Sequence, residues 1–366
     1  MIKWSKPQLS GVASGANLQA MKASIFKPKT PAGGPGPHGA LTELLAQTPA
    51  EAVDRLRALA DDLQIAYAAN TLRSWRADWR VWTEFCERHG YALLPATLPV
   101  LREFLVDRIG QGRKRATIEH YLATLTVVHR LAGLPSPMDS MEARLMWRGL
   151  RREHLSSRQR QAKGLTMDDI DTIVATLDLA NPRDLRDAAL LSLAFETMFR
   201  RSELIVLRIE DLSVEDDGSG RIFLPSSKTD QEGAGFLQYI SPETLVLVQD
   251  WIRVAGLTRG PIFRSTPRSN KADRYDTPLS DRDVARLFKQ RALQAGLDPS
   301  RVSGHSTRVG AAQDLIAANF SGAEIMRQGR WKTERMVIRY SESLNAGRGA
   351  MARLKKLKRL ADQMDE

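Results

Sequence analysis

The sequence predicts a mainly α-helical protein, in which an N-terminal helical bundle is followed by a mostly helical C-terminal domain with a small antiparallel β-sheet. Two observations favour this fold class. Apolar residues recur at steps of three and four along most of the chain after Leu41, whereas strand-like runs are confined to residues 221–224 and 235–240. In addition, 366 residues are enough for two domains of ordinary size, each with its own core.

The composition is strongly basic. Lysine and arginine (54) outnumber aspartate and glutamate (43), which gives a formal net charge of +11 and a pI of about 9.9. We therefore expect a polyanionic partner, although net charge alone does not distinguish nucleic acid from anionic lipid. No segment approaches the ~20 apolar residues that span a bilayer, and the N-terminus lacks the apolar region of a signal peptide, so we expect a cytoplasmic protein without a membrane partner. The single cysteine, Cys86, excludes an intrachain disulfide, and with six histidines we expect no metal site.

Residues 1–40 are predicted to form a disordered basic tail. They lack apolar periodicity and include the Pro- and Gly-rich stretch KPKTPAGGPGPHG. Such a segment buries too little apolar surface to offset the entropy that it loses on ordering.

Residues 41–155 are predicted to form the helical bundle. One helix carries a stripe of apolar side chains at steps of three and four, which we expect to be buried: Leu72, Trp75, Trp79, Trp82 and Cys86. On another face of the same helix lie Arg73, Arg76 and Arg80, which either follow the phosphates of a nucleic acid or are simply solvated. A second helix, 115–131, begins after Lys114 with Arg115, and this basic start suits a helix end near DNA.

A basic linker is predicted at residues 156–165. The segment RREHLSSRQRQAKG, residues 151–164, is polar and has no apolar face. Because a basic linker can lie along a phosphate backbone, its arginines are further candidates for DNA contact: Arg151, Arg152, Arg158 and Arg160.

Residues 166–366 are predicted to form the C-terminal domain. Its first helix begins at the candidate N-cap Thr166, and further helices are expected over NPRDLRDAALLSLAFETMF, 242–254, 281–295 and 304–319. The two strands flank the polar turn SSKTDQEGA and are expected to pair as a hairpin.

Several polar side chains of this domain occur where packing alone does not require them. Arg200 and Arg201 directly follow an apolar helix, so at least one guanidinium begins near the core and needs either a carboxylate such as Glu203 or a bound anion. His305 and Arg308 are spaced for one face of an otherwise apolar helix. Lys228 lies at the tip of the hairpin, and Trp331 and Tyr340 flank a short helical segment. Each of these residues, taken singly, has an ordinary structural explanation.

Taken in chain order, they form a series that resembles the tyrosine recombinase (phage integrase-like) family. The series consists of FRRSEL, SSKT, HSTR and GRW, followed by a tyrosine about one helical segment later, and the resemblance extends over residues 65–355. It implies a core-binding domain and a catalytic domain, with Tyr340 as nucleophile and Arg200, Arg308, His305 and Trp331 as donors to a phosphate. It further implies Lys228 as the proton donor and Glu203 as a positioning residue. The sequence departs from the family pattern at Met198, where many members have glycine, and at Trp331, where most have histidine.

The resemblance implies a site-specific DNA recombinase that works through a 3′-phosphotyrosine intermediate and a Holliday junction, without ATP or a metal ion. The implied partners are double-stranded DNA with inverted-repeat half-sites and further copies of the chain, a homotetramer on two sites with a dimer on each. It also implies a bacterial, plasmid or phage origin and a place at the nucleoid. Alternatives are an integrase that needs accessory factors, a type IB topoisomerase and a catalytically silent DNA-binding regulator.

A C-terminal helix is expected from residue 349 to about 360. Its apolar residues recur at steps of three: Met351, Leu354, Leu357 and Leu360. The resemblance implies that this helix docks into a neighbouring protomer, and the sequence leaves packing on its own domain open.

Overall fold

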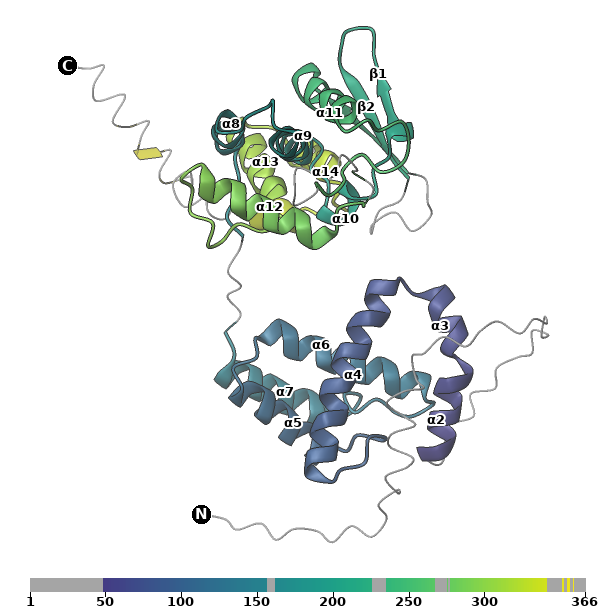
Figure 1. Cartoon of the computed structure of the whole chain (residues 1–366). Coiled ribbons are helices and arrows are strands. Elements are labelled where there is room, and N and C mark those ends of the chain that lie inside the picture. Colours follow the sequence, from purple (N-terminus) through teal and green to yellow (C-terminus); the bar gives the residue numbers. More distant parts are fainter. Residues whose placement is uncertain are drawn as a thin grey trace. The chain divides into compact units, whose positions relative to one another are not determined.

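The structure is a computed structural model that describes residues 49–156, 162–225, 235–266, 275, 277–340, 351, 354, 355 and 358 (Figure 1). The chain divides into two compact units, residues 1–159 and 160–366. The predicted tail, residues 1–40, lies outside the described residues, as does most of the hairpin turn. Over the described ranges the predicted fold class is confirmed: the chain is mainly helical with one small antiparallel sheet. None of the helices described is both long enough and apolar enough to cross a membrane.

The N-terminal unit is built from helices that surround an aromatic core. The apolar stripe predicted on the long helix is buried, and Trp82 meets Phe104 edge to face with ring centroids 5.1 Å apart. The buried indole N–H of Trp82 donates to the carbonyl oxygen of Leu93 at 3.0 Å, so burial leaves no polar atom of that ring unpaired. The helices are α2 (Pro49–Ala58), α3 (Ala60–Ala66), α4 (Ala69–His89), α5 (Leu98–Gly110), α6 (Arg115–Leu131) and α7 (Met141–His154).

A polar cluster joins α4 to α6 beside this core. The Thr124 hydroxyl donates to the Asp78 carboxylate at 2.7 Å, and Nδ1 of His120 contacts the same carboxylate. The Ser74 hydroxyl lies 3.3 Å from Nε2 of His120. These contacts fix the orientation of α4 relative to α6. Helix α4 carries Arg73, Arg76 and Arg80, and α6 begins with Arg115.

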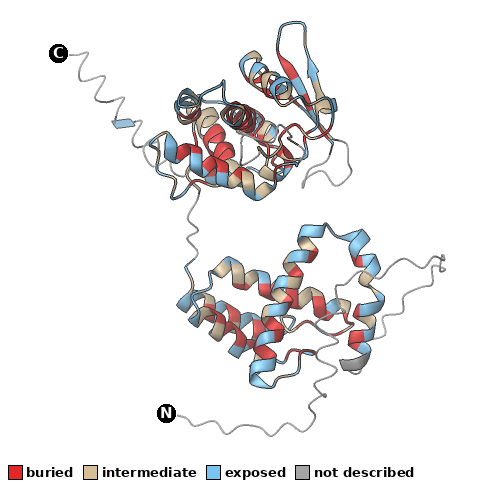
Figure 2. Cartoon of the chain, in the orientation of Figure 1, coloured by how far each residue is buried: buried red, intermediate tan, exposed pale blue. Residues whose placement is uncertain are grey.

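The C-terminal unit is organised around α9 (Pro182–Glu196), which is buried on most of its surface. Its residues from Ala188 to Leu191 are all inaccessible to solvent, and it packs against α8, α11 and α13. Figure 2 shows buried residues concentrated on α9 and α13. The other elements are α8 (Met167–Ala175), α10 (Arg201–Leu204), η1 (Ile209–Asp211), β1 (Leu212–Val214), β2 (Gly220–Leu224), β3 (Phe236–Ile240), α11 (Pro242–Val254), α12 (Asp281–Gln294), α13 (Ser306–Ala317) and α14 (Gly322–Gly329). Residues 335–340 are also helical.

The sheet has three antiparallel strands in the order β1-β2-β3. The predicted hairpin is formed by β2 and β3, with Arg221 opposite Tyr239 and Leu224 opposite Phe236. Along β2 buried and exposed residues alternate, as expected for a sheet with one solvated face. Strand β1 was not predicted, because three residues are too few to establish a period of two.

The end of the predicted linker is packed into the C-terminal unit, which corrects the expected boundary at residue 166. The Lys163 backbone N–H donates to the Arg301 carbonyl at 3.0 Å, and that of Leu165 donates to the Ser306 carbonyl at 2.9 Å. Leu165 is fully buried, and a Cβ atom at Gly310 of α13 would lie 1.6 Å from its carbonyl oxygen. This close backbone approach is possible only because residue 310 is glycine. Residues 163–165 therefore belong to the fold of the C-terminal unit.

Candidate active site

A turn after α9 provides the carbonyl groups around which the site is built. Met198 is fully buried and has a φ of +49°, in the left-handed region that favours glycine. The left-handed φ accounts for the glycine that many family members have at this position, and nothing in the structure explains the methionine. The turn directs the Met198 carbonyl oxygen toward two guanidinium groups, those of Arg308 and Arg330.

Arg308 lies in the first turn of α13 and is only 2% exposed. Its guanidinium donates to the Met198 carbonyl and, at 2.8 Å, to the Gly329 carbonyl, and it lies 5.5 Å from the ring centre of Trp331. Burial, with the nearby charges of Arg200 and Arg330, lowers the pKa of Arg308 to about 10, which still leaves it protonated near neutral pH. The buried guanidinium is thus held in one orientation by two carbonyl groups.

Arg200 precedes the short helix α10 and forms an ion pair with Glu203, one of the two kinds of partner that the sequence left open. One Glu203 oxygen lies 2.5 Å from the Arg200 guanidinium, and the other accepts the Arg200 backbone N–H at 2.8 Å. Glu203 is almost fully buried, so its charge requires this pairing.

A third arginine, Arg330, completes this cluster, and it was not selected from the sequence. It donates to Glu203 at 2.9 Å and to the carbonyls of Thr197 and Met198 at 3.1 Å each. Its guanidinium also lies 4.6 Å from the ring centre of Phe199. The only signal in the sequence was its position in GRW, between a glycine and the tryptophan of the predicted series.

His305 immediately precedes α13, which begins at Ser306 and not at the predicted Gly304. His305 is exposed, whereas Arg308, three residues further along the chain, is buried. Partial desolvation, together with the charges of Arg308, Arg201 and Arg200, lowers the pKa of His305 below its ordinary value. The imidazole is therefore neutral near pH 7 and able to accept a proton.

Trp331 and Tyr340 lie together at the end of the described part of the unit. Their ring centres are 5.3 Å apart and tilted by 49°, and both residues are buried. A Cβ atom at Gly329 would lie 2.8 Å from the indole, so the ring packs directly on glycine backbone. The structure thus brings Tyr340 to Trp331, and Trp331 to the Arg308 guanidinium.

The other sequence candidates are distributed over the chain. Lys228, Arg158 and Arg160 lie outside the described residues. Arg73, Arg80, Lys114 and Arg152 are exposed, whereas Arg76 is half-buried.

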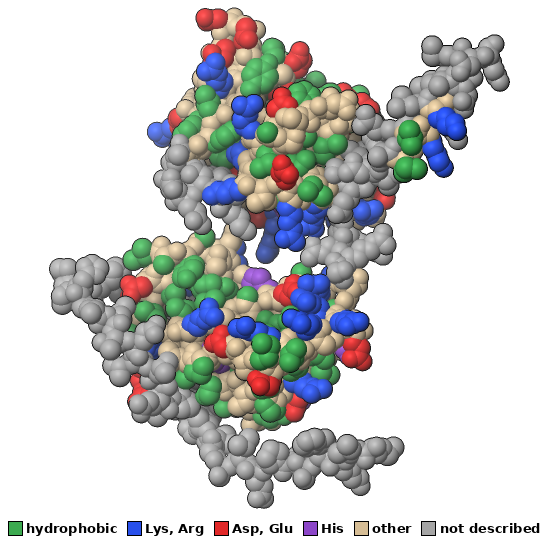
Figure 3. Space-filling view, turned by 180° about the vertical axis from the view of Figure 1, so that it is seen from behind, with side chains coloured by type: hydrophobic (Ala, Val, Ile, Leu, Met, Phe, Trp, Pro, Cys, Tyr) green, Lys and Arg blue, Asp and Glu red, His purple; other side chains and the backbone are tan. Residues whose placement is uncertain are grey.

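Two further candidates for DNA contact share one carboxylate. The Arg115 guanidinium lies 2.9 Å from Glu119, and that of Arg151 lies 3.8 Å from the same Glu119 oxygen. Figure 3 shows Lys and Arg side chains gathered in a broken band on one face of the N-terminal unit.

An apolar groove of about 720 Å³ lies in the C-terminal unit beside the Met198 turn. Its apolar lining includes Phe195, Leu315, Phe320 and Ile325, and its acidic lining includes Asp168, Glu196, Asp314 and Glu324. The side chain of Phe320 is half exposed. This groove could not be predicted from sequence, since its walls come from α8, α9, β3, α13 and α14.

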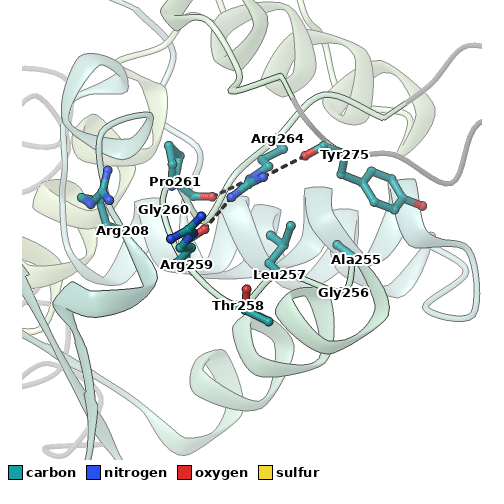
Figure 4. Close-up of a pocket in the computed structure, with 10 residues that line it drawn as sticks. All are labelled: Arg208, Ala255, Gly256, Leu257, Thr258, Arg259, Gly260, Pro261, Arg264 and Tyr275. Atoms are coloured by element: carbon teal, nitrogen blue, oxygen red, sulfur yellow. Dashed lines mark hydrogen bonds between the residues drawn. The ribbon is translucent and has the colours of Figure 1, made fainter.

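A second pocket, of about 630 Å³, lies at the loop after α11 (Figure 4). Its Arg264 donates to the carbonyl oxygens of Arg259, Pro261 and Tyr275 at 2.6, 3.0 and 3.2 Å. These bonds close the loop on itself. None of the cluster residues around Arg308 lines this pocket.

A buried arginine cluster with an adjacent tyrosine, carried by a helical unit with a small sheet, defines an enzyme of the tyrosine recombinase class. The model of the phage integrase family matches residues 163–346. The chain is 30% identical to recombinase cre of Escherichia phage P1 over 79% of this chain and 88% of that protein. It is 32% identical to an integrase/recombinase XerD homolog of Selenomonas ruminantium over 77% of this chain and 84% of that one. The chain belongs to the phage integrase family and is a tyrosine site-specific recombinase that resembles Cre.

Solved structures share the same fold. A XerH recombinase bound to a palindromic difH substrate superposes with a TM-score of 0.59 at 13% identity, covering 85% of this chain and 91% of that one. A lambda integrase dimer bound to a COC′ core site gives a TM-score of 0.55 at 18% identity, covering 81% and 77%. At 13% and 18% sequence identity, these comparisons show that the backbone fold is shared.

Proposed function

We propose that the chain binds double-stranded DNA at inverted-repeat half-sites and recombines it through a 3′-phosphotyrosine intermediate and a Holliday junction, in the manner of Cre. The observation that carries this proposal is the contact series Arg200–Glu203–Arg330 and Arg308–Trp331–Tyr340. In this series the ring of Tyr340 packs on the indole that contacts the Arg308 guanidinium, and a phenol near fixed guanidinium groups supports attack on a phosphodiester.

Arg200 and Arg308 bind the non-bridging oxygens of the scissile phosphate. Each has N–H donors beyond those used in the contacts described above, and a planar guanidinium suits two oxygens of one phosphate. Because protein carbonyls and a carboxylate already fix both groups, little reorganisation is needed as negative charge develops. The indole N–H of Trp331 supplies a further donor.

Tyr340 attacks the phosphorus, and the bond to the 5′ oxygen breaks as the bond to the phenol oxygen forms. The neutral imidazole of His305 accepts the phenolic proton, and Lys228 gives a proton to the departing 5′ hydroxyl. Since the phosphotyrosine bond replaces one phosphodiester with another, the 5′ hydroxyl of the partner strand reverses the step without ATP. The arginines supply the charge for which other enzymes use metal ions, so no metal ion is required.

The basic residues of the N-terminal unit hold the DNA backbone. Arg73, Arg80, Lys114 and Arg152 are exposed and available to phosphates. Three other arginines contribute less to phosphate binding in the free protein. Arg76 is half-buried, and Arg115 and Arg151 share the Glu119 carboxylate. Arg158 and Arg160, which lie outside the described residues, are further candidates for phosphate contact.

Four protomers assemble on two sites, with two on each, and the C-terminal helix of one protomer docks into its neighbour. Met351 and Leu354 are both more than half exposed, which leaves these apolar side chains accessible to a second copy of the chain. The groove beside the Met198 turn combines apolar walls with four carboxylates and one arginine, Arg327, so that its lining carries more negative than positive groups. The sequence MARLKKLKRL combines an apolar stripe with cations. This complementarity makes residues 351–360 of a second copy the occupant that we propose for the groove.

The test is a nicked suicide substrate that carries the chain's own recombination site. The natural chain forms a covalent adduct that survives denaturation and is removed by protease, whereas Tyr340→Phe binds the same DNA with equal affinity and forms none. If the natural chain binds its site and forms no adduct, the proposal is overturned. The chain is then a catalytically silent DNA-binding regulator. An adduct on arbitrary plasmid with relaxation of supercoils indicates topoisomerase activity instead, and recombination only with added bending proteins indicates an integrase with accessory factors.

A further inference from the structure

The residue that caps α14 at its C-terminal end is an arginine, Arg330, in a backbone conformation that favours glycine. Arg330 follows Gly329 with a φ of +53°, in the left-handed region where an L side chain is strained. Its side chain is only 5% exposed, and its Nε has no hydrogen-bond partner among the described residues. A strained backbone and a buried, incompletely satisfied cation both cost folding free energy, on the order of 1–3 kcal/mol each. Stability alone therefore does not account for arginine at this position.

The contacts of Arg330 converge on the groups that hold the two other arginines of the cluster. It donates to the Met198 carbonyl at 3.1 Å, and Arg308 donates to that same oxygen. It also donates at 2.9 Å to one oxygen of Glu203, whose other oxygen pairs with Arg200 at 2.5 Å. Arg330 therefore shares the Met198 carbonyl with Arg308 and the Glu203 carboxylate with Arg200.

The charge of Arg330 has a further effect on Glu203. A carboxylate shared between two guanidinium groups satisfies neither completely, so Arg200 keeps more of its charge for a substrate phosphate than it would in a closed pair with Glu203. We do not assign Arg330 to that phosphate, because its guanidinium already donates to Glu203 and to the carbonyls of Thr197 and Met198. It also lies 4.6 and 5.5 Å from the ring centres of Phe199 and Phe236.

We infer that Arg330 is a positioning residue for DNA cleavage, which orients Arg308 through the Met198 carbonyl and Arg200 through Glu203. This inference rests on the proposed roles of Arg200 and Arg308. A displacement of about 1 Å at reacting groups costs on the order of 10²-fold in rate, and this is the size of effect that we expect on loss of the side chain.

The experiment compares Arg330→Gly, Arg330→Lys and Asn319→Gly with the natural chain in single-turnover adduct formation on the suicide substrate. Arg330→Gly relieves the left-handed strain and is expected to keep its melting temperature and its DNA affinity, while its cleavage rate falls about 10²-fold. Arg330→Lys keeps the charge but cannot reach the two carbonyls and the carboxylate together, so its rate lies between those of the natural chain and Arg330→Gly. Asn319, with a φ of +64°, is the matched control, because glycine there relaxes a left-handed residue without removing a guanidinium.

The pathway through Glu203 is tested by combining Arg330→Gly with Glu203→Gln. If Arg330 acts through Glu203, the rate loss of the double variant is smaller than the product of the two single losses. A cleavage rate for Arg330→Gly equal to that of the natural chain would overturn the inference, and so would a rate loss that only parallels lower thermal stability or weaker DNA binding. Absence of an adduct with the natural chain would instead count against the proposed function.

Discussion

The ring centres of Trp331 and Tyr340 lie 5.3 Å apart, and this contact connects the tyrosine to the arginine cluster. Trp331 also lies against the Arg308 guanidinium and on the backbone of Gly329. The indole thus has two separable properties, its packing area and its N–H donor.

Trp331 variants separate these two properties. Trp331→Phe keeps most of the packing and loses the donor, so we expect adduct formation to fall by about 10²-fold, as for loss of one donor to a developing oxyanion. Trp331→His restores a donor on a smaller ring and is expected to cleave faster than Trp331→Phe, although it melts at a lower temperature. Single-turnover cleavage and thermal unfolding measure the two effects, and equal rates for the two variants would show that packing alone matters.

Arg201→Gln is predicted to change how the cleavage rate depends on pH: on acidification, the rate is expected to begin to fall at a higher pH than in the natural chain. The charge of Arg201 helps to lower the pKa of His305, so its removal raises that pKa toward the ordinary value of about 6.5. Neutral His305 is then lost at a higher pH as the solution is acidified, and the rate begins to fall earlier. Arg201→Lys keeps the charge and is expected to retain the natural profile. An unchanged acidic limb in Arg201→Gln would remove His305 from the role of proton acceptor.

Glu119→Gln is predicted to strengthen DNA binding. The substitution frees Arg115 and Arg151 from their shared carboxylate, and each new phosphate contact adds a slope of about −0.9 to log K against log salt. Fluorescence anisotropy at several salt concentrations measures both affinity and slope. Glu84→Gln, which removes an exposed carboxylate on α4, is the control for the change in net charge. Affinity gains of equal size in both variants would show that the two arginines were already available.

Gly310→Ala is predicted to destabilise the C-terminal unit by on the order of 1–3 kcal/mol or more. Its Cβ would lie 1.6 Å from the Leu165 carbonyl oxygen, which forces the backbone of residues 163–165 away from α13. Gly322→Ala is the matched control on α14, where a Cβ atom meets nothing within 4 Å, and it is expected to raise stability by up to about 1 kcal/mol. Thermal unfolding of the whole chain should therefore shift in opposite directions for the two variants.

The proposed docking of the C-terminal helix is tested by two variants used separately and together. Deletion of residues 349–366 and the groove variant Phe320→Asp are each expected to abolish cooperative binding to a full site while leaving half-site binding intact. The truncated chain keeps an intact groove, and the Phe320→Asp chain keeps an intact C-terminal helix. If the helix docks between protomers, a dimer of one truncated chain and one Phe320→Asp chain regains one of its two helix–groove contacts, and cooperative binding returns in the mixture. Unchanged cooperativity in the truncated chain would contradict docking, and failure of the mixture would place the helix on its own domain.

Local patterns in the sequence predicted most of the helices and the hairpin. The span of α6, Arg115–Leu131, and that of α11, Pro242–Val254, match the expected ranges, because apolar spacing is a local signal and α11 also has Ser241 as its N-cap. The linker boundary was misplaced, since Leu165 is buried by contacts with residues 140 positions and more away. The groove and the sharing of Glu203 likewise depend on elements that meet only in the folded unit.

By itself the sequence determined the fold class and the series of polar residues from Arg200 to Tyr340, because both are properties of spacing and residue type along the chain. Only the tertiary structure decided which of those residues touch. It showed that the left-handed turn at Met198 presents one carbonyl to two arginines, and that Arg330 shares Glu203 with Arg200. The physical reason is that a buried charge is positioned by the partners that satisfy it. Those partners come from the turn after α9, from α10 and from the end of α14, which the chain brings together only on folding.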